Sequence, residues 1–134
     1  ISITLYSKID IMYITKKYTT GSKVPFTVTG SIQDKNNAFY NAGDIISVTY
    51  TIYKVTGGKY LPETDMENVA VIPSQCFFSP EVNNTFTSGY YNFQHTIPAN
   101  ENLFSVKGGK YMVDYRIHPS IGEVFGFTIY VNVI

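Results

Sequence analysis

The chain has 134 residues, of which 44% are hydrophobic and 15% charged, and its formal net charge is +0. This composition is typical of a folded globular protein and excludes the charge-rich, apolar-poor class of disordered chains. A neutral chain whose only arginine is Arg116 lacks the basic surface that nucleic-acid binding requires, so we expect no nucleic-acid partner. The length predicts a single domain, residues 1–134, with one core.

The sequence predicts neither a transmembrane segment nor an intramolecular disulfide. No apolar run approaches the roughly 20 residues that cross a bilayer, so we expect no transmembrane segment. The single cysteine, Cys76, allows neither an intramolecular disulfide nor a thiolate metal framework, and we expect it to be a small buried hydrophobe. The chain begins at Ile1, which fits a mature protein whose signal peptide has been removed. We therefore expect an extracellular or cell-surface protein, and the frequent Ile, Lys, Asn and Tyr favour a bacterial source.

β-Branched and aromatic residues dominate the sequence, and no window has the apolar spacing of an amphipathic helix, so the sequence predicts an all-β fold. Residues 1–14 read as one or two edge strands. Residues 24–32 predict a strand with Phe26 and Val28 turned inward, because side chains alternate between the two faces of a strand. Residues 33–43 are rich in Asn, Asp and Gly and predict an exposed connection.

A β-hairpin is predicted in the middle of the chain. Residues 45–55 alternate between apolar and polar side chains, and the Gly57–Gly58 pair supplies the positive φ that a two-residue hairpin turn needs before a second strand at 59–61. The side chains expected to point inward from the first strand are Ile46, Val48, Tyr50 and Ile52.

The second half of the chain predicts further strands. A short strand over 67–72 ends at Pro73, and residues 79–84 form a loop. Longer strands follow at 91–97, 110–117 and 124–133. In the strand at 91–97 we expect three side chains to point inward, Tyr91, Phe93 and Ile97, and three to point outward, Asn92, Gln94 and Thr96. In the strand at 124–133, one face carries Phe125, Phe127, Ile129, Val131 and Val133. Seven to nine short strands are typical of a β-sandwich.

The segment Gly109-Lys110-Tyr111-Met112-Val113-Asp114-Tyr115 resembles the G-x-Y-x-C core of strand F in immunoglobulin-like domains. Tyr111 stands at the tyrosine-corner position and Val113 where the cysteine would be. The resemblance implies an immunoglobulin-like antiparallel β-sandwich in which the Tyr111 hydroxyl bonds to backbone in the loop 100–106. The chain has no Trp and no Cys pair, which departs from the antibody type. This superfold hosts many functions and implies none of them.

Side chains suited to catalysis or metal binding are sparse. The two histidines, His95 and His118, lie on different predicted elements without metal-ligand spacing. The turn at 34–37 lacks the ordered carboxylates of a calcium loop. The carboxylates Asp10, Asp34, Asp44, Asp65 and Asp114 and the glutamates fall mostly in predicted turns, although Asp114 belongs to the strand predicted over 110–117. We expect no catalytic, cofactor-binding or metal-binding residues, and no enzyme.

Tyrosine is the most unusual feature, with twelve tyrosines beside nine phenylalanines. Four tyrosines have the inward parity and are expected in the core: Tyr50, Tyr91, Tyr111 and Tyr115. Others are candidates for sugar stacking or protein contact, because a tyrosine ring brings a large contact area at low entropic cost. These candidate ligand contacts are Tyr40, Tyr53, Tyr60, Tyr90 and Tyr130. Cross-strand pairing on a sheet face is the alternative role for the same rings.

The sequence favours a secreted, non-enzymatic interaction or structural module whose partner is a protein or carbohydrate surface. The alternative is a carbohydrate-binding module that uses its surface tyrosines, and three or more exposed tyrosines in one patch would favour it. The long apolar strand at 124–133 also predicts oligomers, because an unpaired strand recruits the edge of another chain.

Overall fold

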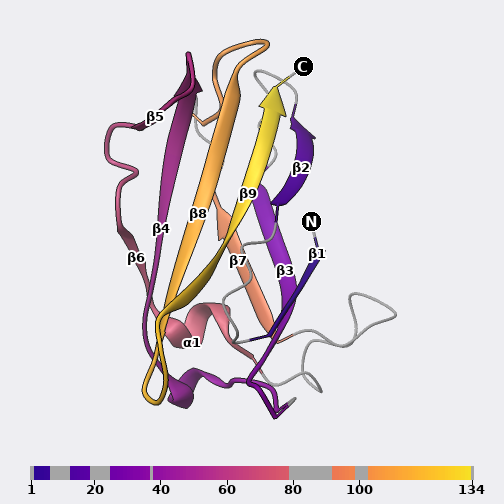
Figure 1. Ribbon diagram of the computed structural model, residues 1–134, viewed down its shortest axis with the longest axis vertical. Coiled ribbons are helices and arrows are strands. Elements are labelled where there is room, and N and C mark those ends of the chain that lie inside the picture. Colours follow the sequence, from indigo (N-terminus) through magenta and orange to yellow (C-terminus); the bar gives the residue numbers. More distant parts are fainter. Residues whose placement is uncertain are drawn as a thin grey trace.

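The computed structural model describes residues 2–6, 13–18, 25–36, 38–78, 92–98 and 103–133, with the backbone alone for 2–6 and 13–18. Its elements along the chain are β1 (Ser2–Tyr6), β2 (Tyr13–Tyr18), β3 (Phe26–Gln33), the 3-10 helix η1 (Ala42–Asp44), β4 (Ile45–Thr56), β5 (Lys59–Pro62), β6 (Val69–Val71), α1 (Pro73–Cys76), β7 (Phe93–Ile97), β8 (Lys110–Pro119) and β9 (Phe125–Val133) (Figure 1). The predicted all-β class is confirmed, since the two helical elements have three and four residues. Within the described ranges, no helix is long and apolar enough to cross a membrane.

The strands form two sheets that lie one behind the other (Figure 1). The larger sheet has the order β2-β9-β8-β4-β5, with β6 also paired to β4, and the smaller has the order β1-β3-β7. Neighbours are antiparallel except for two pairs, β1 with β3 and β2 with β9, which run parallel. The two sheets face each other across a core, in the manner of a β-sandwich.

The core is built from the alternation that the sequence predicts. In β3 every second side chain is buried, beginning with Phe26 and Val28, and in β9 the five predicted inward residues are all buried. Aromatic rings join the sheets: Phe93 of the smaller sheet makes edge contacts with Tyr115 and Phe127 of the larger, at centroid distances of 5.8 and 5.7 Å. Such edge-to-face contacts add to the free energy that burial of the rings provides.

One predicted core residue, Ile46, points to solvent and not into the core. Its side chain is 60% exposed, whereas that of Ile45 is 7% exposed. The pairing of β4 with β8 shifts register between Ile45 and Ser47, and such a bulge puts an extra residue into one strand. Alternation is regular only beyond the bulge, where Val48, Tyr50 and Ile52 are buried as predicted.

The hairpin prediction is confirmed. Gly57 and Gly58 have φ values of 55° and 76°, and Thr56 pairs with Lys59 on either side of them. Both turn residues lie in the left-handed region, which glycine enters without steric cost, so the two glycines set the register between β4 and β5.

The hydrogen bond implied for Tyr111 is present. Its hydroxyl accepts from the backbone N–H of Val106 at 3.1 Å, and the ring is 1% exposed. Gly109 allows this close turn, because a Cβ there would lie 2.8 Å from the carbonyl oxygen of Val106. The connection that enters β8 is therefore pinned to the strand, as in a tyrosine corner.

The prediction that 124–133 offers an unpaired edge is wrong. β9 is paired on both sides, with β8 and with β2, because the N-terminal segment supplies a parallel neighbour that hydrophobic alternation does not reveal. Among the described strands, β2 lies at one edge of the larger sheet and β5 and β6, both paired to β4, lie at the other, while β1 and β7 border the smaller sheet. β1 falls within the edge strands predicted for residues 1–14, whereas β2 shares only residues 13 and 14 with that prediction and extends to Tyr18.

Asn92 was expected to point outward, and this prediction is also wrong. It lies just before β7 and is fully buried. Its Oδ1 accepts from the N–H of Ile32 at 2.7 Å, and its Nδ2 donates to the carbonyl oxygens of Ile32 and Tyr40 at 2.8 and 2.7 Å. Asn92 thus ties β3 to the chain that follows it. The predicted loop at 79–84 and the predicted core residue Tyr91 lie outside the described residues.

Candidate functional site

Three of the five candidate tyrosines lie on the outer face of the larger sheet. Tyr53 of β4 pairs with Met112 of β8, which pairs with Tyr130 of β9. Tyr60 of β5 pairs with Val55 of β4. Residues directly opposite each other in an antiparallel ladder share one face, so these side chains lie on the same surface.

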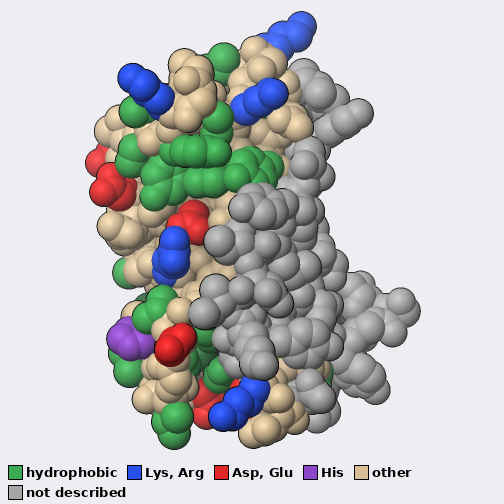
Figure 2. Space-filling view, in the orientation of Figure 1, with side chains coloured by type: hydrophobic (Ala, Val, Ile, Leu, Met, Phe, Trp, Pro, Cys, Tyr) green, Lys and Arg blue, Asp and Glu red, His purple; other side chains and the backbone are tan. Residues whose placement is uncertain are grey.

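These side chains form a continuous surface that we call the outer-face band. Its members are Tyr53, Val55, Tyr60, Pro62, Met112 and Tyr130. Figure 2 shows hydrophobic side chains gathered across the face that β4, β8 and β9 present to the viewer. Tyr60 is 49% exposed, and Tyr53, Met112 and Tyr130 are partly exposed. Large exposed apolar patches on soluble proteins often mark contact sites.

The spacing of the rings follows from the spacing of the strands. Neighbouring strands lie about 4.8 Å apart, so the backbones at Tyr53 and Tyr130, which are two strands apart, are separated by roughly 10 Å. Tyr60 lies diagonally from Tyr53 on the next strand, at about 7 to 8 Å. The three rings therefore form a row that crosses the strands.

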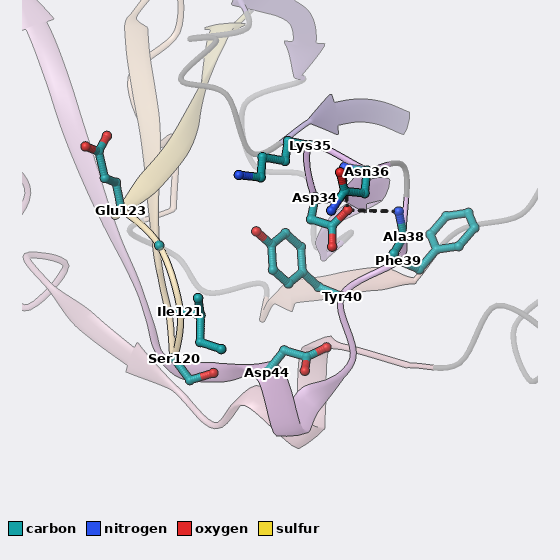
Figure 3. A pocket seen from close by; sticks show the side chains of 11 residues that line it. Asp34, Lys35, Asn36, Ala38, Phe39, Tyr40, Asp44, Ser120, Ile121 and Glu123 are labelled. Carbon is teal, nitrogen blue, oxygen red and sulfur yellow. Dashed lines mark hydrogen bonds between the residues drawn. The ribbon is translucent and has the colours of Figure 1, made fainter.

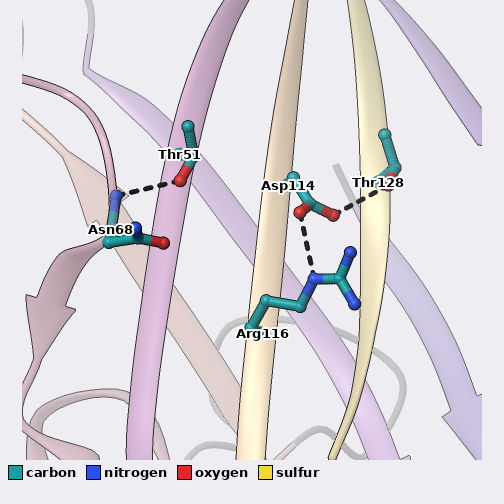
Figure 4. A network of polar contacts seen from close by, with 5 residues as sticks. All are labelled: Thr51, Asn68, Asp114, Arg116 and Thr128. Carbon is teal, nitrogen blue, oxygen red and sulfur yellow. Dashed lines mark hydrogen bonds and ion pairs between the residues drawn. The ribbon is translucent and has the colours of Figure 1, made fainter. Parts of the chain in front are cut away.

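A polar network borders this row on the side toward η1 (Figure 4). The carboxylate of Asp114 accepts from the Thr128 hydroxyl and from Nε of Arg116, both at 3.1 Å. Thr51, aligned with Asp114 on β4, accepts from the N–H of Asn68 at 2.9 Å. The Arg116 side chain is 63% exposed, so its guanidinium is available to solvent, whereas that of Asp114 is 16% exposed. Asp114 lies within β8, in the strand that the sequence predicts over 110–117.

The fourth candidate, Tyr40, lies elsewhere. It belongs to a pocket of about 580 Å³ between the connection after β3 and the β8–β9 turn (Figure 3). Its ring stacks on that of Phe125, with a centroid distance of 5.6 Å. Asp34 accepts from the N–H groups of Asn36 and Ala38 at 2.8 and 3.0 Å, so it shapes a turn, as the sequence predicts. Asp44 accepts from the N–H of Asn41 at 3.0 Å. The fifth candidate, Tyr90, lies outside the described residues.

A second pocket, of about 430 Å³, contains His95 and Tyr50. Nδ1 of His95 lies 2.7 Å from the hydroxyl of Tyr115, and the Tyr50 ring is 5.0 Å from the imidazole. Burial lowers the pKa of His95 to about 4 and raises the pKa values of Tyr50 and Tyr115, because desolvation disfavours the charged form of each group. All three groups are therefore neutral at pH 7.

The remaining groups that the sequence singled out lie apart. Cys76 is fully buried, as predicted, and burial raises the pKa of its thiol to about 12, so the nucleophilic thiolate is scarce. His118 is exposed on the outer face, and its register partner Ser47 is far along β4 from the tyrosine row. In the described part of the chain, no three His, Cys, Asp or Glu side chains gather to hold a metal ion.

Sequence reasoning identified the tyrosines but missed their neighbours. Met112, Asp114 and Thr128 have the outward parity on their strands, and only the order of strands in the sheet brings them beside Tyr53 and Tyr130. The parity was readable from the sequence, whereas the order of strands is a property of the whole fold.

Comparisons with known proteins add little to this geometry. No protein-family model matches the chain, and no curated protein matches it. Among solved structures, the N-terminal domain of phage TP901-1 ORF48 is similar, with a TM-score of 0.41 and 10% sequence identity over 99% of this chain and 98% of that chain. This similarity between β-sheet domains assigns no family.

Proposed function

We propose that this chain is a non-enzymatic binding module that holds carbohydrate on the outer face of its larger sheet. The observation that carries the proposal is the convergence of Tyr53, Tyr60 and Tyr130 in one row. The sequence alone offered five scattered tyrosines, and three of them share a surface that crosses four neighbouring strands, from β5 to β9.

The chemistry of the band suits a sugar chain. A pyranose ring has an apolar face that packs on an aromatic ring, while its hydroxyls need donors and acceptors at the edge of the contact. The network of Asp114, Arg116 and Thr128 supplies both beside the row. The separation of roughly 10 Å between Tyr53 and Tyr130 is about the length of two sugar residues in an extended chain.

The state of the buried titratable groups supports a role without catalysis. A base with a pKa of about 4 and a thiol with a pKa of about 12 are both poorly matched to proton transfer or nucleophilic attack at pH 7. Nδ1 of His95 and the hydroxyl of Tyr115 form a hydrogen bond with each other, which is the role of a structural pair.

An immunoglobulin-like topology for the sandwich is part of the proposal. Strands β3 and β7 pair as strands B and E would, and β4, β8 and β9 pair as C, F and G would, with β5 beside β4. The bond of Tyr111 to Val106 supports the same assignment.

An extracellular or cell-surface location and a bacterial source would suit a carbohydrate ligand. Self-association through an edge strand would involve β5 or β7 and not β9, which is paired on both sides.

A protein partner is the second candidate. Met112 lies between the tyrosines, and Tyr60, at the end of the row, is 49% exposed. Met and aromatic side chains are enriched at protein interfaces, so the same surface could hold another chain.

The test is a glycan array probed with the wild-type domain and with a Tyr53→Ala/Tyr130→Ala variant. Each stacked ring contributes about 1 kcal/mol, so loss of both should weaken binding by roughly 30-fold. Tyr40→Leu, at the far pocket, is the matched control and should bind as the wild type does. Thermal unfolding of each variant shows whether the fold is kept.

Binding that falls only in the double variant supports the proposal. If the wild-type domain binds no glycan, or if the folded double variant binds as tightly as the wild type, the proposal is wrong and the protein-contact candidate takes its place.

A further inference from the structure

The neutral chain has an uneven distribution of charge. Lys54, Lys59, Lys107 and Lys110 all lie where β4 ends, β5 and β8 begin and β9 ends. Lys59, Lys107 and Lys110 are exposed. Strand β2 adds Lys16 and Lys17 at register positions opposite Val131 and Asn132. Six of the ten basic residues in the chain therefore belong to one end of the larger sheet.

Among the described residues, the stretches of strand around these lysines carry no carboxylate, although Glu63 follows β5 and Asp114 lies further along β8. The described segments 53–62, 103–112 and 128–133 contain four lysines and no Asp or Glu. Figure 2 shows Lys and Arg side chains at this end, above the outer-face band. At the other end of the sheet, Asp34, Asp44 and Glu123 border the pocket that contains Tyr40 (Figure 3). Among the described residues, lysines thus gather at one end of the larger sheet, and three carboxylates and Lys35 lie around the pocket at the other end.

The basic end adjoins the band directly. Lys110 has the outward parity on β8, and its register partners are Val55 of the band on one side and Asn132 on the other. Lys107 comes just before the turn in which Gly108 donates to the carbonyl oxygen of Val133, at the end of β9. A ligand stacked on Tyr53 and Tyr130 would therefore have lysine ammonium groups along its border toward this end.

We propose that the ligand of the outer-face band is a linear polysaccharide that carries carboxylate groups, of the uronic-acid type. This inference rests on the proposed function and narrows it. The sugar rings stack on the tyrosines, and the carboxylates along one edge of the chain pair with Lys107 and Lys110. The hydroxyls along the other edge meet Asp114, Arg116 and Thr128.

A single-stranded nucleic acid also combines stacking rings with negative charge. The neutral chain, in which Arg116 is the only arginine, disfavours it, because recognition of a phosphodiester backbone draws on a strongly basic surface. The Asp114 carboxylate beside the row is an acceptor for hydrogen bonds from sugar hydroxyls. The proposal is therefore committed to the polysaccharide, and single-stranded DNA serves as a comparison ligand.

The experiment measures binding of polygalacturonate, alginate and hyaluronan fragments by calorimetry, each beside its carboxyl-reduced form, which keeps the sugar backbone without the charge. The variant Lys107→Gln/Lys110→Gln removes two exposed charges, and Lys35→Gln, exposed beside the pocket that contains Tyr40, is the matched control. Exposed charge pairs contribute little individually, so we expect the double lysine variant to bind at least one carboxylated polymer about fivefold more weakly, and Lys35→Gln to bind it unchanged.

Binding of a carboxylated polymer should also weaken as salt rises, because exposed charges are screened. Equal binding of a reduced polymer, or unchanged binding by the double lysine variant, would overturn this inference while leaving carbohydrate binding intact. Tighter binding of single-stranded DNA than of any polysaccharide would overturn it as well. Failure to bind any polymer, charged or reduced, would count against both the inference and the proposed function.

Discussion

Asn92 shows how one buried side chain holds two segments together. Its amide forms three hydrogen bonds, and replacement by alanine would leave the N–H of Ile32 and the carbonyl of Tyr40 without these partners, while the carbonyl of Ile32 would keep its bond from the N–H of Tyr40. Unsatisfied buried backbone groups cost about 1 to 3 kcal/mol each, and partial hydration lowers the sum. We expect Asn92→Ala to reduce the free energy of unfolding by about 3 kcal/mol in urea denaturation. Asn36→Ala, at an exposed turn position, is the control; a loss below about 1 kcal/mol for Asn92→Ala would contradict the assigned role.

His95 predicts a specific dependence of stability on pH. Its pKa is about 4 in the folded protein and about 6.5 when unfolded, so the unfolded chain binds the proton more tightly. The free energy of unfolding should therefore fall as pH drops from about 6.5 to about 4, by on the order of 2 kcal/mol. Tyr50 and Tyr115 face the imidazole and stay neutral throughout this range.

The carboxylates titrate over part of the same range, so the measurement is a comparison of variants. In His95→Gln, the loss of stability between pH 7 and pH 4.5 should be smaller than in the wild type by about 2 kcal/mol. His118→Gln, at an exposed position, should keep the wild-type profile. If the free energy of unfolding falls with pH by the same amount in the wild type and in His95→Gln, the imidazole is not desolvated as described.

At the scale of elements, the connection into β8 depends on the Tyr111 hydroxyl. Tyr111→Phe keeps the buried ring, which contacts Phe104 at 5.3 Å, and removes only the acceptor for the N–H of Val106. We expect the free energy of unfolding to fall by about 1 to 2 kcal/mol. Hydrogen exchange at the Val106 amide should become faster. Tyr60→Phe, on the exposed hairpin, should change neither quantity.

Local patterns in the sequence were sufficient for most strands and for the hairpin. Alternation located β3, β8 and β9, because each has one face in the core, and the glycine pair located the β4–β5 turn. The failures have a common cause. The bulge after Ile45, the partner that covers β9 and the inward turn of Asn92 are all set by contacts with strands distant in sequence. The outer-face band could be predicted only in part, for the same reason. The sequence identified Tyr53 and Tyr130 as candidates, but the order of strands in the sheet is what brings them together.

At the scale of the whole molecule, two features place the proposed ligand. The aromatic row crosses the larger sheet, and the charge of the neutral chain is separated along the sheet, with lysines at the end nearer the row. The pocket around Tyr40 lies at the end of the sheet away from the lysines. The pocket around His95 lies against the inward-facing side of β4, at Tyr50. The three surfaces are distinct, so a ligand can be assigned to one of them by where it perturbs the protein.

The most direct measurement is chemical-shift mapping of the ¹⁵N-labelled domain during titration with the oligosaccharide that binds best. The account predicts that the largest shifts fall on Tyr53, Met112, Asp114 and Tyr130, on the outer face, while Tyr40, Ser120 and His95 keep their resonances. Shifts centred on the pocket around Tyr40 or on the pocket around His95, or no shift with any oligosaccharide at millimolar concentration, would contradict the claim that this sheet face binds carbohydrate.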